Sequence, residues 1–394
     1  MWERLKYIDG IKGIACFLVF VHHFLLAFYI AYFTGNPAES HMNSQIDVKM
    51  AQSPVSVVVN GQFWVCMFIL VSSFLAAKQI FSTNNMERVA GSIWKRYFRL
   101  MLPMLVIGII TWAMHTKGMF TNQEVAQVTG SWWLEAYFEQ PLSLKEMLYT
   151  VLYDVWMGDV EASVQISHAF WMMTYLLVGY YMVVLLTFVV KHTTKWSYCL
   201  LVLAAGIAFK YGHYYYLTVI AGVWLADLSR SIQENKVKNW YHHVTCVVLL
   251  LVGGYLGGYP SGVVPTNHYA KLPFGQITNV CIVYHVLAAI IVFGVLLYWK
   301  PFQRFCCLKP FCMLGTLCYS IFLVQTPIEF SLSLNIFQSL LNSGRSYHVS
   351  VCISFLISTV ALLISAGIFH ALVEKNCDKG LKFVQERLLK KKER

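Results

Sequence analysis

The sequence predicts an all-α, polytopic membrane protein with about ten transmembrane helices and with both termini in the cytoplasm. Hydrophobic residues make up 58% of the 394 residues, and charged residues only 12%. A typical soluble domain carries about 25% charged residues, which cover its surface. The apolar residues also fall into long runs, and a helix of roughly 20 apolar residues crosses the ~30 Å hydrocarbon layer of a bilayer.

Ten apolar runs follow one another along the chain, and we expect each to form one membrane-spanning helix. The first run is longer than the hydrophobic region of a signal peptide and no small-residue cleavage site follows it, so we expect it to be retained. The fifth and sixth runs are separated only by the short hinge 210–213. The predicted spans are 11–33, 56–78, 100–115, 168–190, 196–210, 212–227, 241–258, 279–299, 311–333 and 350–373.

The positions of the basic residues predict the orientation. Most of the 30 lysines and arginines lie in the N-terminal segment, in alternate loops and in the C-terminal tail, and cytoplasmic loops carry such an excess. This bias explains the net charge of +11 without a nucleic-acid partner. We divide the chain into a membrane domain, 1–380, with a long outer loop at 116–167, and a basic cytoplasmic tail, 381–394, suited to contact anionic lipid.

The 11 cysteines predict neither a disulfide framework nor a metal site. Most of them lie within apolar runs, where cysteine behaves as a small hydrophobic side chain. The others show no CxxC spacing. We therefore expect no bound metal and no permanently bound cofactor.

The outer loop contains an amphipathic segment, 143–158, which we expect to lie on the outer membrane interface. The same loop carries Trp132, Trp133 and Trp156. These tryptophans either belong to the aromatic belt of a membrane protein or line a groove in which aromatic faces stack on the sugar rings of an acceptor.

The stretch 7–24, YIDGIKGIACFLVFVHHF, places ionisable side chains inside the first apolar run. An ionisable residue within a membrane span indicates a functional site. Lys12 and His23 are eleven residues apart, so they share one helix face and lie roughly 16 Å apart along the axis. His22 points about 80° away from that face, and we expect it to be a packed or snorkelling histidine. His23 alone could equally be satisfied by a neighbouring helix.

A second constellation lies just before the third predicted span. Arg96 and Arg99 are spaced i, i+3 and share a helix face, and Pro103 falls in the first turn of the span. Paired guanidinium groups suit phosphate, although anchoring to lipid headgroups is the alternative. Together with His23, the pair indicates a phosphate-bearing donor on the inside, a deeper reaction centre and an acceptor from outside.

These residues resemble the acyltransferase family 3 of integral membrane proteins, and the resemblance covers nearly the whole chain. The stretch 7–24 is similar to the family's opening Leu-Asp-Gly-Leu-Arg-Gly run and its histidine, with Lys12 in place of the usual arginine. Arg96, Arg99 and Pro103 match its Arg-x-x-Arg before a proline. Further segments are similar at 68–77, with Ser73 where glycine is usual; at 167–183, around His168 and Trp171; and at 317–328, with Gln325 where histidine is common.

The resemblance implies an acyltransferase of the cell membrane. It would move an acetyl group or another short acyl group from cytoplasmic acyl-CoA, such as acetyl-CoA, to a hydroxyl of an extracytoplasmic glycan or cell-envelope polysaccharide. The expected partners are therefore acyl-CoA, a glycan acceptor and membrane lipid, and no nucleic acid. The alternative is a non-enzymatic transporter or flippase of a glycan precursor or small polar substrate, with Lys12 and His23 lining its path.

The resemblance also assigns roles to residues. His23 would be the catalytic base, since the usual pKa of histidine lies near neutrality, with a covalent acyl-histidine as the alternative. Lys12 would orient the donor or pair with Asp9. Arg96 and Arg99 would bind the phosphates of coenzyme A, and its pantetheine arm would reach His23. Supporting roles fall to Asp9, Ser73, His168 and Trp171.

Overall fold

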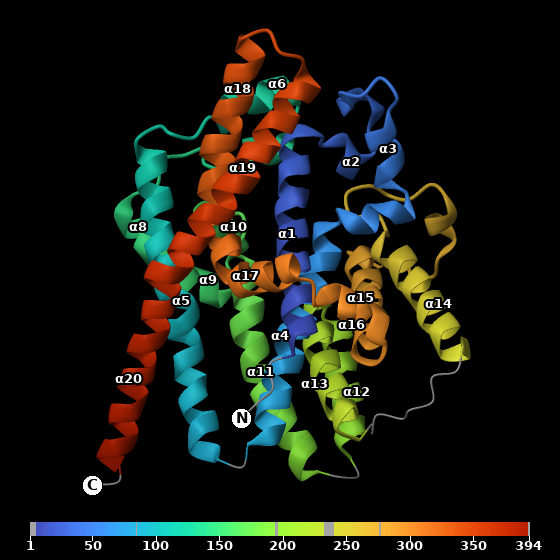
Figure 1. Cartoon of the computed structure of the whole chain (residues 1–394), viewed down its shortest axis with the longest axis vertical. Helices are drawn as coiled ribbons and strands as arrows, with labels where there is room; N and C mark the ends of the chain where they lie inside the picture. Colours follow the sequence, from blue (N-terminus) through green and yellow to red (C-terminus); the bar gives the residue numbers. More distant parts are fainter. Residues whose placement is uncertain (1–4, 84, 194–195, 232–239, 276, 393–394) are drawn as a thin grey trace. The chain divides into compact units, whose positions relative to one another are not determined.

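The computed structural model describes residues 5–83, 85–193, 196–231, 240–275 and 277–392. Within these ranges the regular structure is helical and contains no β-strand, which confirms the all-α class (Figure 1). The chain divides into two compact units, and α1, α11 and α17 contribute residues to both. The first unit comprises Met1–His23, Ala31–Asn84 and Val178–Thr316, and the second Phe24–Ile30, Asn85–Leu177 and Leu317–Arg394.

The first unit is built around long apolar helices, of which α4 packs against both α13 and α15. Its elements are α1 (Lys6–Phe28, up to His23), α2 (Ala31–Thr34), η1 (Pro37–Glu39), α3 (Ile46–Ala51), η2 (Pro54–Val58), α4 (Gly61–Ser82), α11 (Met172–His192, from Val178), α12 (Ser197–Lys210), α13 (Tyr215–Ser231), α14 (Trp240–Gly257), η4 (His268–Lys271), α15 (Val280–Tyr298), α16 (Lys300–Cys306) and α17 (Lys309–Pro327, up to Thr316).

The second unit combines long helices with the short helices of the predicted outer loop. Its elements are α5 (Met86–Thr116), α6 (Asn122–Thr129), α7 (Trp132–Glu135), α8 (Leu144–Tyr149), η3 (Thr150–Asp154), α9 (Val155–Met157), α10 (Val160–Val164), the first residues of α11, the remainder of α17, η5 (Ile328–Ser333), α18 (Leu334–Asn342), α19 (Tyr347–Phe369), η6 (His370–Glu374) and α20 (Lys375–Lys392). Three of these elements, η3, η5 and η6, are π-helical.

Each of the ten predicted spans corresponds to a helix, and among the described residues 8 helices are long and apolar enough to cross a membrane. The chain is therefore a multi-pass membrane protein. The predicted fifth and sixth spans are the exceptions, since α12 has 14 residues and α13 has 17. At 1.5 Å per residue, helices of this length fall short of the hydrocarbon thickness unless flanking residues extend them.

The glycines of the Asp-Gly-Ile-Lys-Gly run explain how α1 packs in the first unit. A Cβ atom built on Gly10 would lie 1.8 Å from the carbonyl oxygen of Cys306, and one on Gly13 would lie 2.3 Å from that of Phe311. Any larger side chain would collide with backbone at both positions. The two glycines let α1 approach α16 and the start of α17 at backbone distance.

The third predicted span begins earlier than expected. The helix α5 has 31 residues and starts at Met86, so Arg96 and Arg99 lie within it and Pro103 lies in its interior. Pro103 therefore lies in the first turn of the predicted apolar span but not in the first turn of the helix. Hydropathy marks where the membrane begins, whereas the helix extends beyond it through the polar residues of the boundary.

The outer loop folds as part of the second unit. Its segment 143–158 is helical, as α8, η3 and α9, and α8 and η3 pack against α5. Trp133 and Trp156 are each only 6% exposed, whereas Trp132 is 47% exposed. Trp133 and Trp156 therefore do not form a belt facing the membrane surface.

The basic tail continues a long helix. Residues 347–387 form an uninterrupted helical segment through α19, η6 and α20 (Figure 1), and α20 packs against α5. The boundary predicted at residue 380 falls inside α20, where Leu381 is buried. The last two residues of the tail, 393 and 394, lie outside the described residues.

Candidate active site

A π-helical turn in the second unit holds a buried acidic residue, Glu329. Pro327 ends the regular α17 because it lacks the N–H group that would continue the hydrogen-bond ladder, and η5 follows directly. The Ser331 hydroxyl donates to the carbonyl oxygen of Pro327 at 2.5 Å. Such π turns are frequent at functional sites, and here the turn carries Glu329, which is 4% exposed.

His168 pairs with this carboxylate from a distant segment of the same unit. Its Nε2 lies 3.2 Å from Oε2 of Glu329, and the side chain is 1% exposed. The span 168–190 was predicted to begin at this residue, but α11 begins at Met172 and His168 lies in the turn that precedes it. From this turn, the His168 side chain reaches Glu329.

The other ring nitrogen of His168 is also bound by the protein. Thr326 Oγ1 lies 3.2 Å from Nδ1 of His168, and Ser167 Oγ lies 2.6 Å from Thr326 Oγ1. In a neutral imidazole protonated at Nε2, Nδ1 accepts from the Thr326 hydroxyl, and Nε2 faces the Glu329 carboxylate at ion-pair distance. The Thr326 hydroxyl therefore orients the ring, as positioned side chains do in catalytic triads.

Aromatic side chains enclose His168. The ring centroids of Trp133, Phe330 and Tyr137 lie 5.3, 5.7 and 6.1 Å from that of His168. Burial raises the pKa of Tyr137 to about 12, with a smaller contribution from the Glu329 carboxylate. The Tyr137 phenol therefore stays protonated near neutral pH and is available as a hydrogen-bond donor beside the cluster.

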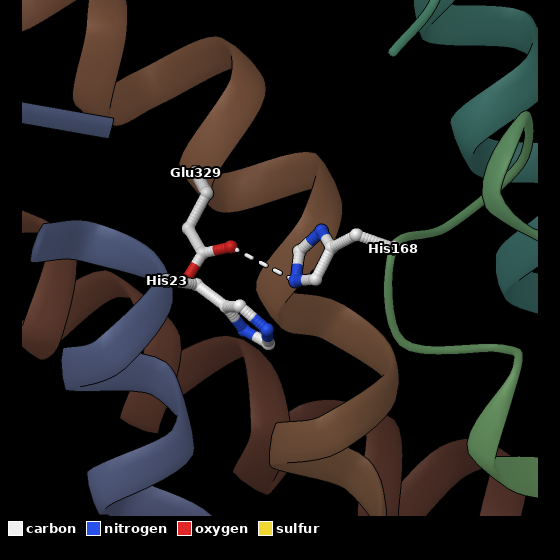
Figure 2. Close-up of side chains that lie close together, drawn as sticks. All are labelled: His23, His168 and Glu329. Atoms are coloured by element: carbon white, nitrogen blue, oxygen red, sulfur yellow. Dashed lines mark ion pairs between the residues drawn. The ribbon is translucent and has the colours of Figure 1, made fainter. Parts of the chain in front are cut away.

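His23 completes a cluster of three side chains. It directly precedes Phe24–Ile30, the part of the α1 region that groups with the second unit. One nitrogen of His23, one nitrogen of His168 and one carboxylate oxygen of Glu329 all lie within 4.8 Å of one another. Figure 2 shows the three side chains pointing toward one another from three separate segments.

The cluster has the components of an acid–base centre. An imidazole can take a proton from a hydroxyl, and a buried carboxylate nearby stabilises the imidazolium that forms. The same three side chains are of the types that bind zinc, which the sequence motifs did not signal because the residues are far apart in the chain. The Glu329 carboxylate would serve in either arrangement, so a bound zinc ion would replace its direct pairing with His168.

Besides His23, three predicted site residues lie in the first unit. The Lys12 ammonium lies 5.6 Å from the centroid of the Phe68 ring, a cation–π contact. Asp9 lies one turn before it on α1. Ser73 is buried on α4. A Cβ atom built on Gly222 of α13 would lie 2.7 Å from the Cβ of Ser73, so Ser73 lies where the two helices cross closely.

His22 belongs to the core of the first unit, as its phase on α1 predicted. Its Nδ1 donates to the carbonyl oxygen of Val59 at 2.9 Å, the Tyr32 hydroxyl contacts the same nitrogen, and the side chain is buried. The neighbouring histidines therefore differ in surroundings: His22 is bonded within the first unit, and His23 belongs to the cluster.

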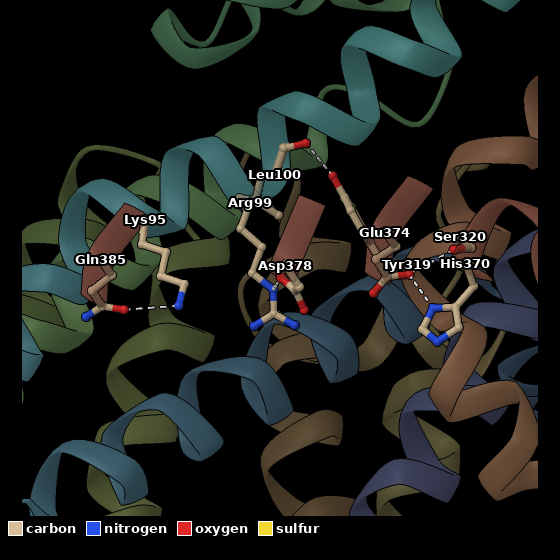
Figure 3. A network of polar contacts seen from close by, with 9 residues as sticks. All are labelled: Lys95, Arg99, Leu100, Tyr319, Ser320, His370, Glu374, Asp378 and Gln385. Carbon is tan, nitrogen blue, oxygen red and sulfur yellow. Dashed lines mark hydrogen bonds and ion pairs between the residues drawn. The ribbon is translucent and has the colours of Figure 1, made fainter. Parts of the chain in front are cut away.

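Arg99 of the predicted phosphate pair lies in a polar network of the second unit (Figure 3), and Arg96 lies one turn before it on α5. Arg99 is half exposed, and its Nε lies 3.1 Å from Oδ1 of Asp378 on α20. Lys95 donates to Gln385 at 3.1 Å. On the facing segment of α17, the Tyr319 hydroxyl donates to the carbonyl oxygen of Leu100 at 2.6 Å.

The same network contains a second pairing of histidine and glutamate. Ser320 Oγ donates to Oε2 of Glu374 at 2.8 Å, and His370 Nδ1 lies 2.8 Å from the same oxygen. Trp171, the remaining predicted residue, follows the His168 turn and packs its ring 5.9 Å from that of Tyr175.

The sequence prediction missed Glu329, Thr326 and Ser167. A signal for Glu329 was present, because it is the only acidic residue within the predicted span 311–333 and an acidic residue in a span marks a functional site. Thr326 and Ser167 carry no such signal, since hydroxyl side chains are common in membrane helices.

The fold and the site define a multi-pass membrane protein with a cluster of two histidines and a glutamate, of which His168 and Glu329 are buried. The family model described as an acyltransferase domain, that of acyltransferase family 3, matches residues 5–370. The chain therefore belongs to this family and is an acyltransferase. No curated protein and no solved structure matches the chain.

Proposed function

We propose that this enzyme transfers an acetyl group or another short acyl group from cytoplasmic acyl-CoA to a hydroxyl of an extracytoplasmic glycan or cell-envelope polysaccharide, at the cell membrane. The observation that carries the proposal is the cluster of His23, His168 and Glu329 (Figure 2). It supplies a base and a stabilising carboxylate among helices long and apolar enough to cross a membrane.

The second unit supports a donor that reaches this cluster from the arginine pair. Tyr319 of α17 bonds to Leu100, the residue after Arg99, and Glu329 lies ten residues further along α17 and η5. Ten helical residues correspond to roughly 15 Å, a length that the pantetheine arm can span. With the phosphates of coenzyme A at Arg96 and Arg99, the thioester would lie beside Glu329.

The transfer step balances with the groups present. His23 takes the proton of the acceptor hydroxyl. The hydroxyl oxygen attacks the thioester carbonyl carbon and forms the new C–O bond. The tetrahedral oxyanion then collapses, and the C–S bond breaks with its electron pair on sulfur. The imidazolium returns the proton to the thiolate, which yields an ester and the free thiol of coenzyme A. Glu329 stabilises the imidazolium, His168 holds Glu329, and Lys12 orients the donor or pairs with Asp9.

The aromatic side chains around His168 support a glycan as the acceptor. Trp133 and Tyr137 come from the predicted outer loop and Phe330 from η5, so their rings converge on the cluster from two segments. Aromatic faces pack against the apolar faces of sugar rings, while the Tyr137 hydroxyl offers a hydrogen bond. A transporter or flippase is the alternative function, but the family match supports an enzyme.

The test uses purified enzyme in proteoliposomes with acetyl-CoA labelled in the acetyl group. We expect alkali-labile label on an added cell-envelope glycan, because the product is an ester. Unlabelled glycan that nevertheless crosses the bilayer would overturn the proposal in favour of transport. Label on another class of molecule would retain the acyl transfer and overturn the acceptor.

A further inference from the structure

Gln325 is a fully buried amide on α17. Its side chain is 0% exposed, and among the described residues neither its Oε1 nor its Nε2 has a hydrogen-bond partner. Buried polar side chains are nearly always paired, because an unpaired amide loses its hydration without compensation. Even two partly exposed glutamines are paired: Gln303 donates to the carbonyl oxygens of Leu296 and Leu297, and Gln338 donates to Glu124.

Gln325 lies between the two polar clusters of the second unit along the helix axis. Glu329 follows it by four residues, which places the two side chains roughly 6 Å apart along the axis and about 40° apart around it. Ser320, which donates to Glu374 in the network of Figure 3, precedes it by five residues. A chain-like ligand that runs from that network to Glu329 passes the level of Gln325.

The carboxamide of Gln325 specifies the kind of group it can bind. It offers N–H donors and a carbonyl acceptor side by side. A secondary amide, with one N–H and one C=O, complements both. The pantetheine arm of coenzyme A contains two secondary amides between its phosphate and its sulfur.

We propose that Gln325 binds an amide of the pantetheine arm and so sets the thioester at the depth of Glu329. This inference rests on the proposed function, because it takes acyl-CoA as the donor. Without a donor the amide remains unpaired. Binding of the arm supplies the missing partners, so the site selects thioesters that carry an amide at this distance from the sulfur.

The test compares Gln325→Met with the unaltered enzyme on three donors: acetyl-CoA, S-acetyl-pantetheine and S-propyl thioacetate, which has no amide. Methionine keeps the length of the side chain and removes both hydrogen-bonding groups. We expect kcat/KM to fall about 10- to 100-fold with the first two donors and to stay within about twofold with the third. Gln338→Met, on the same long helical segment, serves as the control and should retain the activity with all three donors.

Thermal unfolding without donor separates binding from folding. Gln325→Met removes an unpaired buried amide, so its Tm should equal or exceed that of the unaltered enzyme. A lower Tm, or an equal loss with all three donors, would show that the amide serves the fold or a buried water and would overturn the inference. If only the KM for the glycan rose, Gln325 would contact the acceptor and not the donor, which would also overturn the inference. If the unaltered enzyme used none of the three donors, the proposed function would fail first and this inference with it.

Discussion

Nε2 of His168 lies 3.2 Å from Oε2 of Glu329, which joins the turn before α11 to the π turn after Pro327. Both side chains are buried, so the pair exchanges little with solvent. Removing one partner of a buried ion pair leaves the charge of the other partner without compensation. We therefore expect the activity to fall when either side chain is replaced by an uncharged one of the same shape.

Glu329→Gln is the sharpest such change. The amide keeps the size of the side chain but cannot stabilise an imidazolium as a carboxylate does, so we expect the rate of acyl transfer to fall about 100-fold or more. The measurement is labelled acetyl transfer by purified enzyme, normalised to folded protein. Glu135→Gln, at an exposed position of α7, is the control. An undiminished rate in Glu329→Gln would remove this carboxylate from the mechanism.

Thr326→Val tests whether the orientation of His168 matters. Valine keeps the shape of threonine and removes the hydroxyl that bonds to Nδ1 of His168. We expect kcat to fall about tenfold with little change in KM, the pattern of a lost transition-state interaction. Thr187→Val is the matched control, because Thr187 is also buried and its hydroxyl has no partner among the described residues. Equal effects of the two variants would count against a role for the Thr326 hydroxyl.

Asp378→Asn tests the assignment of Arg99 to a phosphate. Oδ1 of Asp378 lies 3.1 Å from Nε of Arg99. The carboxylate would therefore compete with an incoming phosphate for the Arg99 guanidinium group. We expect the KM for acetyl-CoA to fall about two- to fivefold in Asp378→Asn and to rise about tenfold in Arg99→Ala. S-acetyl-pantetheine, which lacks the nucleotide phosphates, should show neither change. Parallel changes for both donors would indicate that the pair only holds α20 to α5.

His22→Ala separates the neighbouring histidines by stability. The change leaves the Val59 carbonyl without its imidazole donor and opens a cavity, so we expect the free energy of unfolding to drop by about 1–3 kcal/mol. His23→Ala should leave the Tm nearly unchanged. Thermal unfolding in detergent measures both, with exposed His213→Ala as the control. Equal Tm values for His22→Ala and His213→Ala would contradict the structural role of His22.

The fold class could be predicted from the sequence because a membrane helix is marked by a continuous run of apolar residues. The structure has a helix at every span predicted from hydropathy. The predicted ends are less accurate: α5, for example, begins at Met86, well before the apolar run. Helical phase also separated His22 from His23 correctly, since both lie on one regular helix. Such periodicity is a property of neighbouring residues and can be read without tertiary structure.

Sequence reasoning named only part of the candidate cluster, because the rest depends on contacts between distant segments. His168 and Glu329 belong to different segments, and neither the turn before α11 nor the π turn after Pro327 has a periodic signature. The pairing of Arg99 with Asp378 is equally remote in the chain. The lone acidic residue in an apolar span was the one signal that could have identified Glu329.

Acetyl transfer by purified His23→Ala, measured beside the unaltered enzyme and His213→Ala, tests most directly whether His23 is the base. Each protein is given labelled acetyl-CoA and a cell-envelope glycan, and the label on the glycan is measured. We expect label on the glycan with the unaltered enzyme and His213→Ala, and at most background label with a His23→Ala protein that keeps the normal Tm. Normal labelling by His23→Ala would contradict the account, because no other side chain in it takes the proton of the acceptor hydroxyl.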